Sequence, residues 1–158
     1  MSLNTRQEIT VKSSTISIDG LYKFAMENSK ITEYYELPGF DMIYLEDSYV
    51  LGLTVHLDHI EIQLDAVLRE GHPDYLPPVA GEQYCYRKAR ILFTGFTNVT
   101  LSNINRNATI DIDGEADYGN IDQFRRLENE FFLSGAWGDF EIVGGKVEIA
   151  LGPEFRDL

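Results

Sequence analysis

The sequence predicts a mainly β protein, in which antiparallel hairpins and a meander form a sandwich or barrel-like sheet with one or two short helices. Apolar residues alternate with polar ones in several stretches, glycine-containing turns separate these stretches, and helical periodicity is scarce. The 158 residues match the usual length of one domain, and 44% of them are hydrophobic. We therefore expect a single domain over residues 1–158, with residues 1–15 loosely ordered because they are polar and aperiodic.

The clearest alternation lies at residues 49–68. Apolar residues occupy every second position up to Leu57, and the phase reverses from Ile60 onward. If Asp58 and His59 form a two-residue turn, the apolar residues of both strands share one face. The opposed pairs would be Leu57/Ile60, Val55/Ile62, Leu53/Leu64, Leu51/Ala66 and Tyr49/Leu68. The other face would pair His56 with Glu61 and Thr54 with Gln63.

The C-terminal residues 131–151 predict a three-stranded meander. A Gly138-Asp139 turn would join its first two strands, and a Gly144-Gly145 turn its last two, since glycine tolerates positive φ. The inward side chains would be Phe131, Leu133, Trp137, Phe140, Ile142, Val147, Ile149 and Leu151. In this register Glu141 and Glu148 would face each other on the polar side, where a basic partner could offset their repulsion.

Further elements are expected elsewhere in the chain. Short strands are predicted at 84–94 and 107–113, because apolar and polar residues alternate there. Short helices are predicted at 19–28, after Asp19 as a cap, and at 122–129, from the spacing of Phe124 and Leu127. The proline-rich stretch 71–81 predicts a loop that crosses the sheet with Tyr75 and Leu76 tucked inward.

The charge balance narrows the class of partner. The chain has 26 acidic and 13 basic residues, a formal net charge of −13. Such a field repels phosphate backbones and anionic lipids, so neither a nucleic acid nor a membrane is expected as a partner. It attracts a basic protein, although solubility alone also explains an acidic surface.

Cysteine and apolar content favour a cytoplasmic location. The single Cys85 cannot form an internal disulfide, and no apolar run reaches the length of about 18 residues that a membrane crossing needs. Cys85 lies close in sequence to Arg87, Lys88 and Arg90, which could make the region electropositive, as around a reactive thiol. A buried structural cysteine is the favoured interpretation, because a nucleophilic thiol also needs a base.

Familiar catalytic motifs are missing from the sequence. It contains no P-loop, no dinucleotide-binding glycine pattern, no HExxH and no GxSxG. These absences favour a protein that is not an enzyme and holds no cofactor, although an active site can be assembled from scattered residues.

The sequence contains two clusters of side chains that could bind a metal ion. His56, Asp58, His59, His72 and Asp74 offer imidazole and carboxylate ligands, but the hairpin register separates them. A surface pair and a polar turn are the favoured interpretation of these residues. The acidic run Asp111, Asp113, Glu115, Asp117 and Asp122 offers oxygen ligands for calcium, but it lacks the closing glutamate of an EF-hand loop.

The leading functional hypothesis is a non-enzymatic, acidic protein-binding protein of the immunity or adaptor type. Its partner would be a basic protein or a second copy of the chain in a homodimer. Tyrosines exceed what one small core needs, and tyrosine is favoured at interfaces. They are Tyr34, Tyr35, Tyr75, Tyr84 and Tyr86, and the expected binding residues are Tyr75, Tyr84, Tyr86, Glu141 and Glu148.

Two rival hypotheses remain open. One is a small metal-dependent enzyme or small-molecule binder that uses the region of His56, His59 and His72. The other is a lipocalin-like carrier, which requires a closed barrel with an apolar interior.

Overall fold

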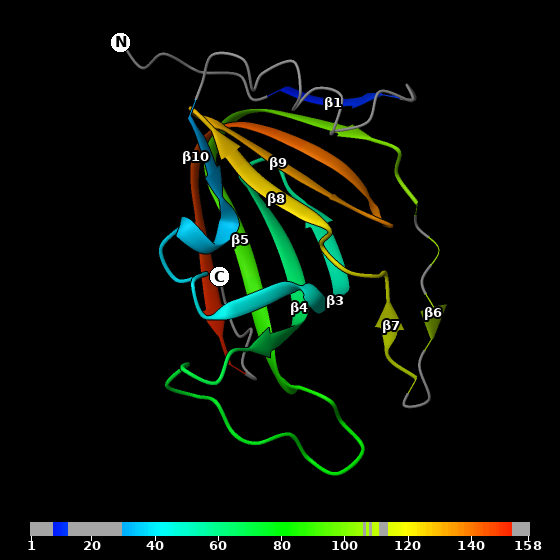
Figure 1. Ribbon diagram of the computed structural model, residues 1–158. Coiled ribbons are helices and arrows are strands. Elements are labelled where there is room, and N and C mark those ends of the chain that lie inside the picture. The colour runs from blue at the N-terminus through cyan, green and yellow to red at the C-terminus, as the bar shows by residue number, and fades with distance from the viewer. Residues whose placement is uncertain (1–7, 13–29, 106, 108, 111–113, 153–158) are drawn as a thin grey trace.

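The computed structural model describes residues 8–12, 30–105, 107, 109–110 and 114–152, and its main element is one curved antiparallel sheet (Figure 1). In spatial order the strands are β2 (Ile31–Glu33), β8 (Gln123–Leu127), β9 (Glu130–Gly135), β10 (Gly138–Leu151), β5 (Cys85–Ser102), β4 (His59–Leu68) and β3 (Ile43–Val55). The prediction of a mainly β chain built from antiparallel hairpins is therefore confirmed, and the described strands do not close into a barrel.

Four smaller elements lie beside this sheet. Strand β1 (Glu8–Lys12) pairs in parallel with β5, and β6 (Thr109–Ile110) pairs with β7 (Ala116–Asp117). A single 3-10 turn, η1 (Tyr34–Glu36), leads from β2 toward β3. Backbone hydrogen bonds link Val50 of β3 to Tyr118 and Gly119, so the chain after β7 borders the β3 edge of the sheet.

Aromatic rings fill the interior that the sheet encloses. The ring centroid of Phe124 lies 5.5 Å from that of Phe40 and 5.8 Å from that of Phe93, and both pairs meet edge to face. This geometry is favourable for aromatic pairs and adds to the gain from burying their area. The inward residues of β4 are all buried, as the sequence predicts: Ile60, Ile62, Leu64, Ala66 and Leu68.

The predicted β3–β4 hairpin is confirmed, but its register is shifted by two residues. Val55 rather than Leu57 lies opposite Ile60, and Thr54 rather than His56 lies opposite Glu61. The backbone N–H of His56 donates to the carbonyl of His59 at 2.8 Å, so the two turn residues are Leu57 and Asp58 rather than Asp58 and His59. Leu57 is 74% exposed at this turn. A shift by an even number keeps Val55 and Ile60 on the same face, so this part of the inward pattern survives.

Strand β3 also contains two irregularities that the alternation did not reveal. The register shifts between Tyr44 and Tyr49 and again between Val50 and Gly52. Each extra residue reverses which side chains face inward. Val50 is therefore fully buried, and Tyr49, which the sequence placed inside, is 37% exposed.

The predicted Gly144-Gly145 turn is wrong, because β10 continues through it as one strand. Both glycines have positive φ, 77° and 78°, and the pairing with β5 shifts between Val143 and Gly144. Positive φ suits a bulge as well as a turn, and the long strand β5 pairs with both halves of β10. Glu141 and Glu148 consequently lie on the same strand and do not face each other: Thr100 is opposite Glu141 and Leu92 opposite Glu148.

The remaining predicted elements have mixed outcomes. The prediction of a helix at 122–129 is wrong, because strand β8 occupies this region. Phe124 belongs to the main core, and Leu127 packs with Phe132 in a second, smaller hydrophobic cluster. The strand at 84–94 is part of the longer β5. Of 107–113, only Thr109–Ile110 is seen as strand, while 108 and 111–113 lie outside the described residues, as does the helix at 19–28. In the 71–81 loop Tyr75 packs on the core, but Leu76 is 59% exposed.

Candidate functional site

Four tyrosines gather on the outer face of the sheet where β3, β4 and β5 lie side by side. Tyr44 of β3, Val67 of β4 and Tyr86 of β5 are register partners, so their side chains share one face. The rings of Tyr49 and Tyr86 stack at a centroid distance of 5.9 Å, and Tyr84 meets Tyr86 edge on at 6.2 Å. We call Tyr44, Tyr49, Tyr84 and Tyr86 the tyrosine surface.

Arg69 holds the ring of Tyr44 in place. Its guanidinium carbon lies 4.0 Å from the ring centroid, and its backbone N–H donates to the carbonyl of Met42 at 2.9 Å. A cation over an aromatic face is attracted by the ring quadrupole. The Nε atom of Arg69 is buried and has no hydrogen-bond partner in the described part of the chain. Tyr44 still exposes 41% of its surface, so part of this residue remains accessible to a partner.

A cavity of about 440 Å³ opens beside the tyrosine surface. Tyr44, Tyr75 and Tyr84 contribute to its lining, together with Arg69 and Pro78. The cavity is large enough to accept one or two side chains of a partner, and its aromatic walls offer contact area at low entropic cost.

Exposed acidic residues lie close in sequence to the tyrosine surface or line its cavity. Glu46 and Asp47 of β3 are exposed, as are Glu70, which lines the cavity, and Glu82. The charge of Glu82 contributes to the electrostatic environment of Tyr86. Each of these carboxylates can attract a lysine or arginine of a partner.

The phenol groups of Tyr86 and Tyr34 stay neutral over the physiological pH range. Burial raises the pKa of Tyr86, and a hydrogen bond with Tyr49 raises it further. Burial also raises the pKa of Tyr34, whose hydroxyl donates to Glu46 Oε2 at 2.6 Å. Tyr34 is only 4% exposed, so it belongs to the core and not to a binding surface.

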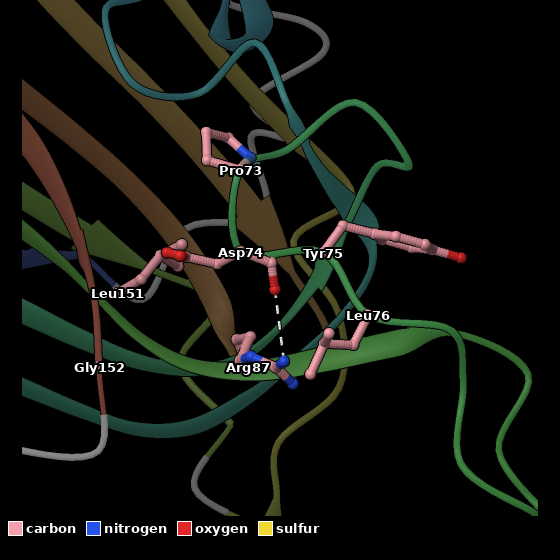
Figure 2. A pocket seen from close by; sticks show the side chains of 7 residues that line it. All are labelled: Pro73, Asp74, Tyr75, Leu76, Arg87, Leu151 and Gly152. Carbon is pink, nitrogen blue, oxygen red and sulfur yellow. Dashed lines mark hydrogen bonds between the residues drawn. The ribbon is translucent and has the colours of Figure 1, made fainter.

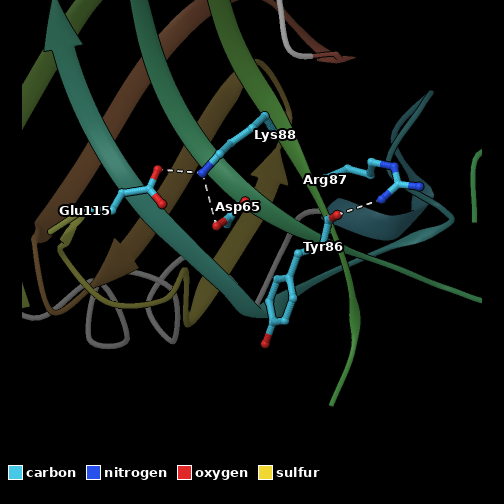
Figure 3. A network of polar contacts seen from close by, with 5 residues as sticks. All are labelled: Asp65, Tyr86, Arg87, Lys88 and Glu115. Atoms are coloured by element: carbon cyan, nitrogen blue, oxygen red, sulfur yellow. Dashed lines mark hydrogen bonds and ion pairs between the residues drawn. The ribbon is translucent and has the colours of Figure 1, made fainter. Parts of the chain in front are cut away.

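Lys88, on this face of β5, is already paired with carboxylates. Figure 3 shows Lys88 between two carboxylates, with its Nζ 3.3 Å from Asp65 Oδ2 and 2.5 Å from Glu115 Oε1. Burial alone would lower the pKa of Lys88, but the hydrogen bond that it donates to Glu115 and the charge of Asp65 outweigh burial and raise the pKa. This ion pair also ties the chain before β7 to the sheet.

The structure brings together three of the five predicted binding residues. Tyr75 and Tyr84 line the same cavity, and Tyr84 contacts Tyr86. Glu141 and Glu148 lie on β10, and Glu148 accepts from Lys146 at 3.2 Å. Sequence reasoning missed Tyr44 and Tyr49, although the adjacent polar residues Glu46 and Asp47 interrupt the alternation and could have signalled a bulge.

The predicted histidine cluster divides between the two ends of β4. His56 and His59 stack at 4.1 Å at one end, and Asp58 Oδ1 lies 2.7 Å from His59 Nδ1, a contact that lowers the pKa of Asp58. His72, whose Nδ1 accepts from the backbone N–H of Asp74 at 3.0 Å, follows the other end. The ends of β4 are roughly 30 Å apart at the usual rise per residue. No three metal-ligating side chains among the described residues converge as a metal site requires.

Two other predicted sites have structural roles where they can be seen. Of the acidic run, Glu115 binds Lys88, Asp117 accepts from the backbone N–H of Gly119 at 2.7 Å, and Asp111 and Asp113 lie outside the described residues. Cys85 is 4% exposed in the main core, and its Sγ accepts from the backbone N–H of Leu76 at 3.4 Å.

A further cavity of about 430 Å³ lies at the start of β5, between the 71–81 loop and the end of β10. Arg87 projects into it and donates to the carbonyl of Asp74 at 3.3 Å, as Figure 2 shows, and to that of Tyr86 at 3.0 Å. The side chains of Asp74 and Tyr75 point to opposite sides of the loop. Arg87 thus anchors the loop to the sheet through backbone carbonyls.

No protein-family model matches the sequence, and no significant match was found among the curated proteins or the solved structures. The described part of the chain contains no helix with the length and apolar character that crossing a bilayer demands.

Proposed function

We propose that this chain is a non-enzymatic binding protein that engages a basic protein through the tyrosine surface. The observation that carries the proposal is the stacked group of Tyr49, Tyr86 and Tyr84, which sits on the outer face of the sheet beside an aromatic cavity. Tyrosine is among the residues that contribute most binding energy at protein interfaces.

Charge supports a basic partner. The chain has a formal net charge of −13, and exposed acidic residues lie close in sequence to the tyrosine surface or line its cavity. They would steer a basic protein toward this face and increase its association rate. Arginines of such a partner could stack on the open tyrosine rings, each contact contributing about 0.5–2 kcal/mol.

The same charge argues against a second copy of the chain as the occupant. A homodimer through this face would bring the acidic residues of both copies together. Like charges placed next to each other at an interface cost roughly several kcal/mol of binding free energy. Sedimentation of the purified chain at low and high salt distinguishes the two occupants. If the wild type forms a homodimer and the variant Tyr49→Ser/Tyr86→Ser does not, the occupant of the tyrosine surface is a second copy of the chain and not a basic protein.

The test compares three immobilised baits in extracts of the source cells: the wild type, Tyr49→Ser/Tyr86→Ser and the control Tyr35→Ser. Tyr35 is also exposed, but its ring packs edge on to Tyr34. We expect a basic protein to be retained by the wild type and the control and lost from the double variant. The purified partner should then bind the double variant at least ten-fold more weakly and lose affinity as salt rises. If no protein distinguishes the double variant from the control, the proposal fails.

A further inference from the structure

We propose that a third cavity, at the end of the sheet where β3 and β5 finish, binds a small, uncharged and mainly apolar molecule. The cavity has a volume of about 490 Å³. Its walls come from four parts of the chain, and the apolar side chains among them are Leu53, Val55, Leu101, Ile104, Tyr118 and Trp137. This volume falls within the usual range for small-molecule sites, about 300–1,000 Å³.

The walls of this cavity are fixed by hydrogen bonds within the protein. The indole N–H of Trp137 donates to the carbonyl of Asn120 at 3.0 Å, and the carbonyl of Trp137 accepts from the backbone N–H of Asn105 at 3.0 Å. Tyr118 is held by the bond from its backbone N–H to Val50, at 2.9 Å. The aromatic walls are therefore in place before a ligand arrives, which lowers the entropic cost of binding.

The lining determines which class of ligand fits. Among the residues that the structure describes, the lining contains no charged side chain, and its polar residues are Thr54, Tyr118 and Asn105. An ion would lose its hydration there without gaining a counter-charge, so a charged ligand is disfavoured. One or two apolar rings with a single hydrogen-bonding group match the lining, and a helix or strand of a partner would exceed the volume.

The tryptophan of the cavity provides a direct test, because Trp137 is the only tryptophan in the sequence. The full chain is titrated with the uncharged fluorophore N-phenyl-naphthylamine while tryptophan is excited. We expect saturable one-to-one binding with energy transfer from Trp137 to the fluorophore. The anionic analogue anilinonaphthalene sulfonate should bind at least ten-fold more weakly. Absence of saturable binding, or equal affinity for both probes, would overturn the proposal.

Variants locate the bound probe. Ile104→Glu places a charge at the rim, where Ile104 is 36% exposed, and Thr54→Phe fills the mouth without adding charge. Each should weaken probe binding at least ten-fold, whereas Val79→Glu, at a residue 63% exposed in the 71–81 loop, should leave it unchanged. Circular dichroism establishes that the variants are folded. Binding that survives in folded Thr54→Phe and Ile104→Glu would place the probe elsewhere and overturn the assignment.

Discussion

The backbone of Gly145 in β10 lies directly against that of Gly95 in β5. A Cβ on Gly145 would be 2.2 Å from the carbonyl oxygen of Thr94 and 2.7 Å from the nitrogen of Phe96. Both glycines have positive φ, 78° and 72°, and the pairing between the strands shifts at the neighbouring Val143 and Gly144. Bulges bend a strand and increase its twist, so this contact is where the sheet curves around its core.

Substitution of Gly145 therefore tests the bend. Gly145→Ala should lower the free energy of unfolding by about 2–4 kcal/mol, from the positive φ and the clash with Thr94 together. Gly81→Ala is the matched control, because Gly81 also has positive φ, 89°, but has open space around it. The control should cost about 1 kcal/mol. Urea denaturation measures the free energy of unfolding of both variants. Equal decreases would contradict the close contact between the backbones at Gly145 and Gly95.

The hairpin register and the aromatic core are tested by a second pair of variants. Phe124 is 1% exposed and touches several aromatic rings, so Phe124→Ala should cost about 3–5 kcal/mol. Leu57 is 74% exposed at the turn, so Leu57→Ala should change stability by no more than about 0.5 kcal/mol. A large loss in Leu57→Ala would favour the register in which Leu57 opposes Ile60.

Alkaline pH should destabilise the fold through Tyr34 and Tyr86. Their folded-state pKa values lie above the ordinary value of 10.0, so the unfolded chain releases these protons first as pH rises. The stabilisation is complete below pH 10 and is lost above it. For the buried Tyr34, the loss approaches about 1.4 kcal/mol per pH unit. Urea denaturation between pH 8 and 11, roughly, measures it, and Tyr34→Phe should flatten this dependence. An unchanged slope in Tyr34→Phe would contradict the assignment.

The ion pair between Lys88 and Glu115 should contribute modestly to stability. Both side chains are 39% exposed, so screening limits the effect, and Glu115→Gln should cost about 0.2–1 kcal/mol at low salt and less at high salt. Glu148→Gln breaks the more exposed pair with Lys146, whose side chain is 69% exposed, and should cost less. Thermal unfolding at two salt concentrations measures both variants. A larger loss in Glu148→Gln would contradict the geometry.

The features that depend only on local alternation of apolar and polar residues could be predicted from the sequence. The inward face of β4 follows directly from Ile60 to Leu68, because no extra residue interrupts the period of two. Tyr84 and Tyr86 could also be paired from sequence, since residues two apart in a strand share a face.

What the sequence could not predict depends on bulges and long-range pairing. The register shifts in β3 turn Tyr44 and Tyr49 outward, and only the pairing with Val67 and Asp65 reveals them. Positive φ at Gly144 and Gly145 suits a turn or a bulge equally, and the length of β5 decides between them. Phe124 and Leu127 have helical spacing but lie in β8, because pairing with β9 overrides the local pattern.

The most direct test of the proposed binding face is a nuclear magnetic resonance titration of the isotopically labelled chain with the basic partner that the wild type retains. We expect the perturbed amides to cluster around Tyr44, Tyr49, Tyr84 and Tyr86. Perturbations confined to the His56 and His59 turn, or to the surroundings of Trp137, with the tyrosine surface unchanged, would contradict it.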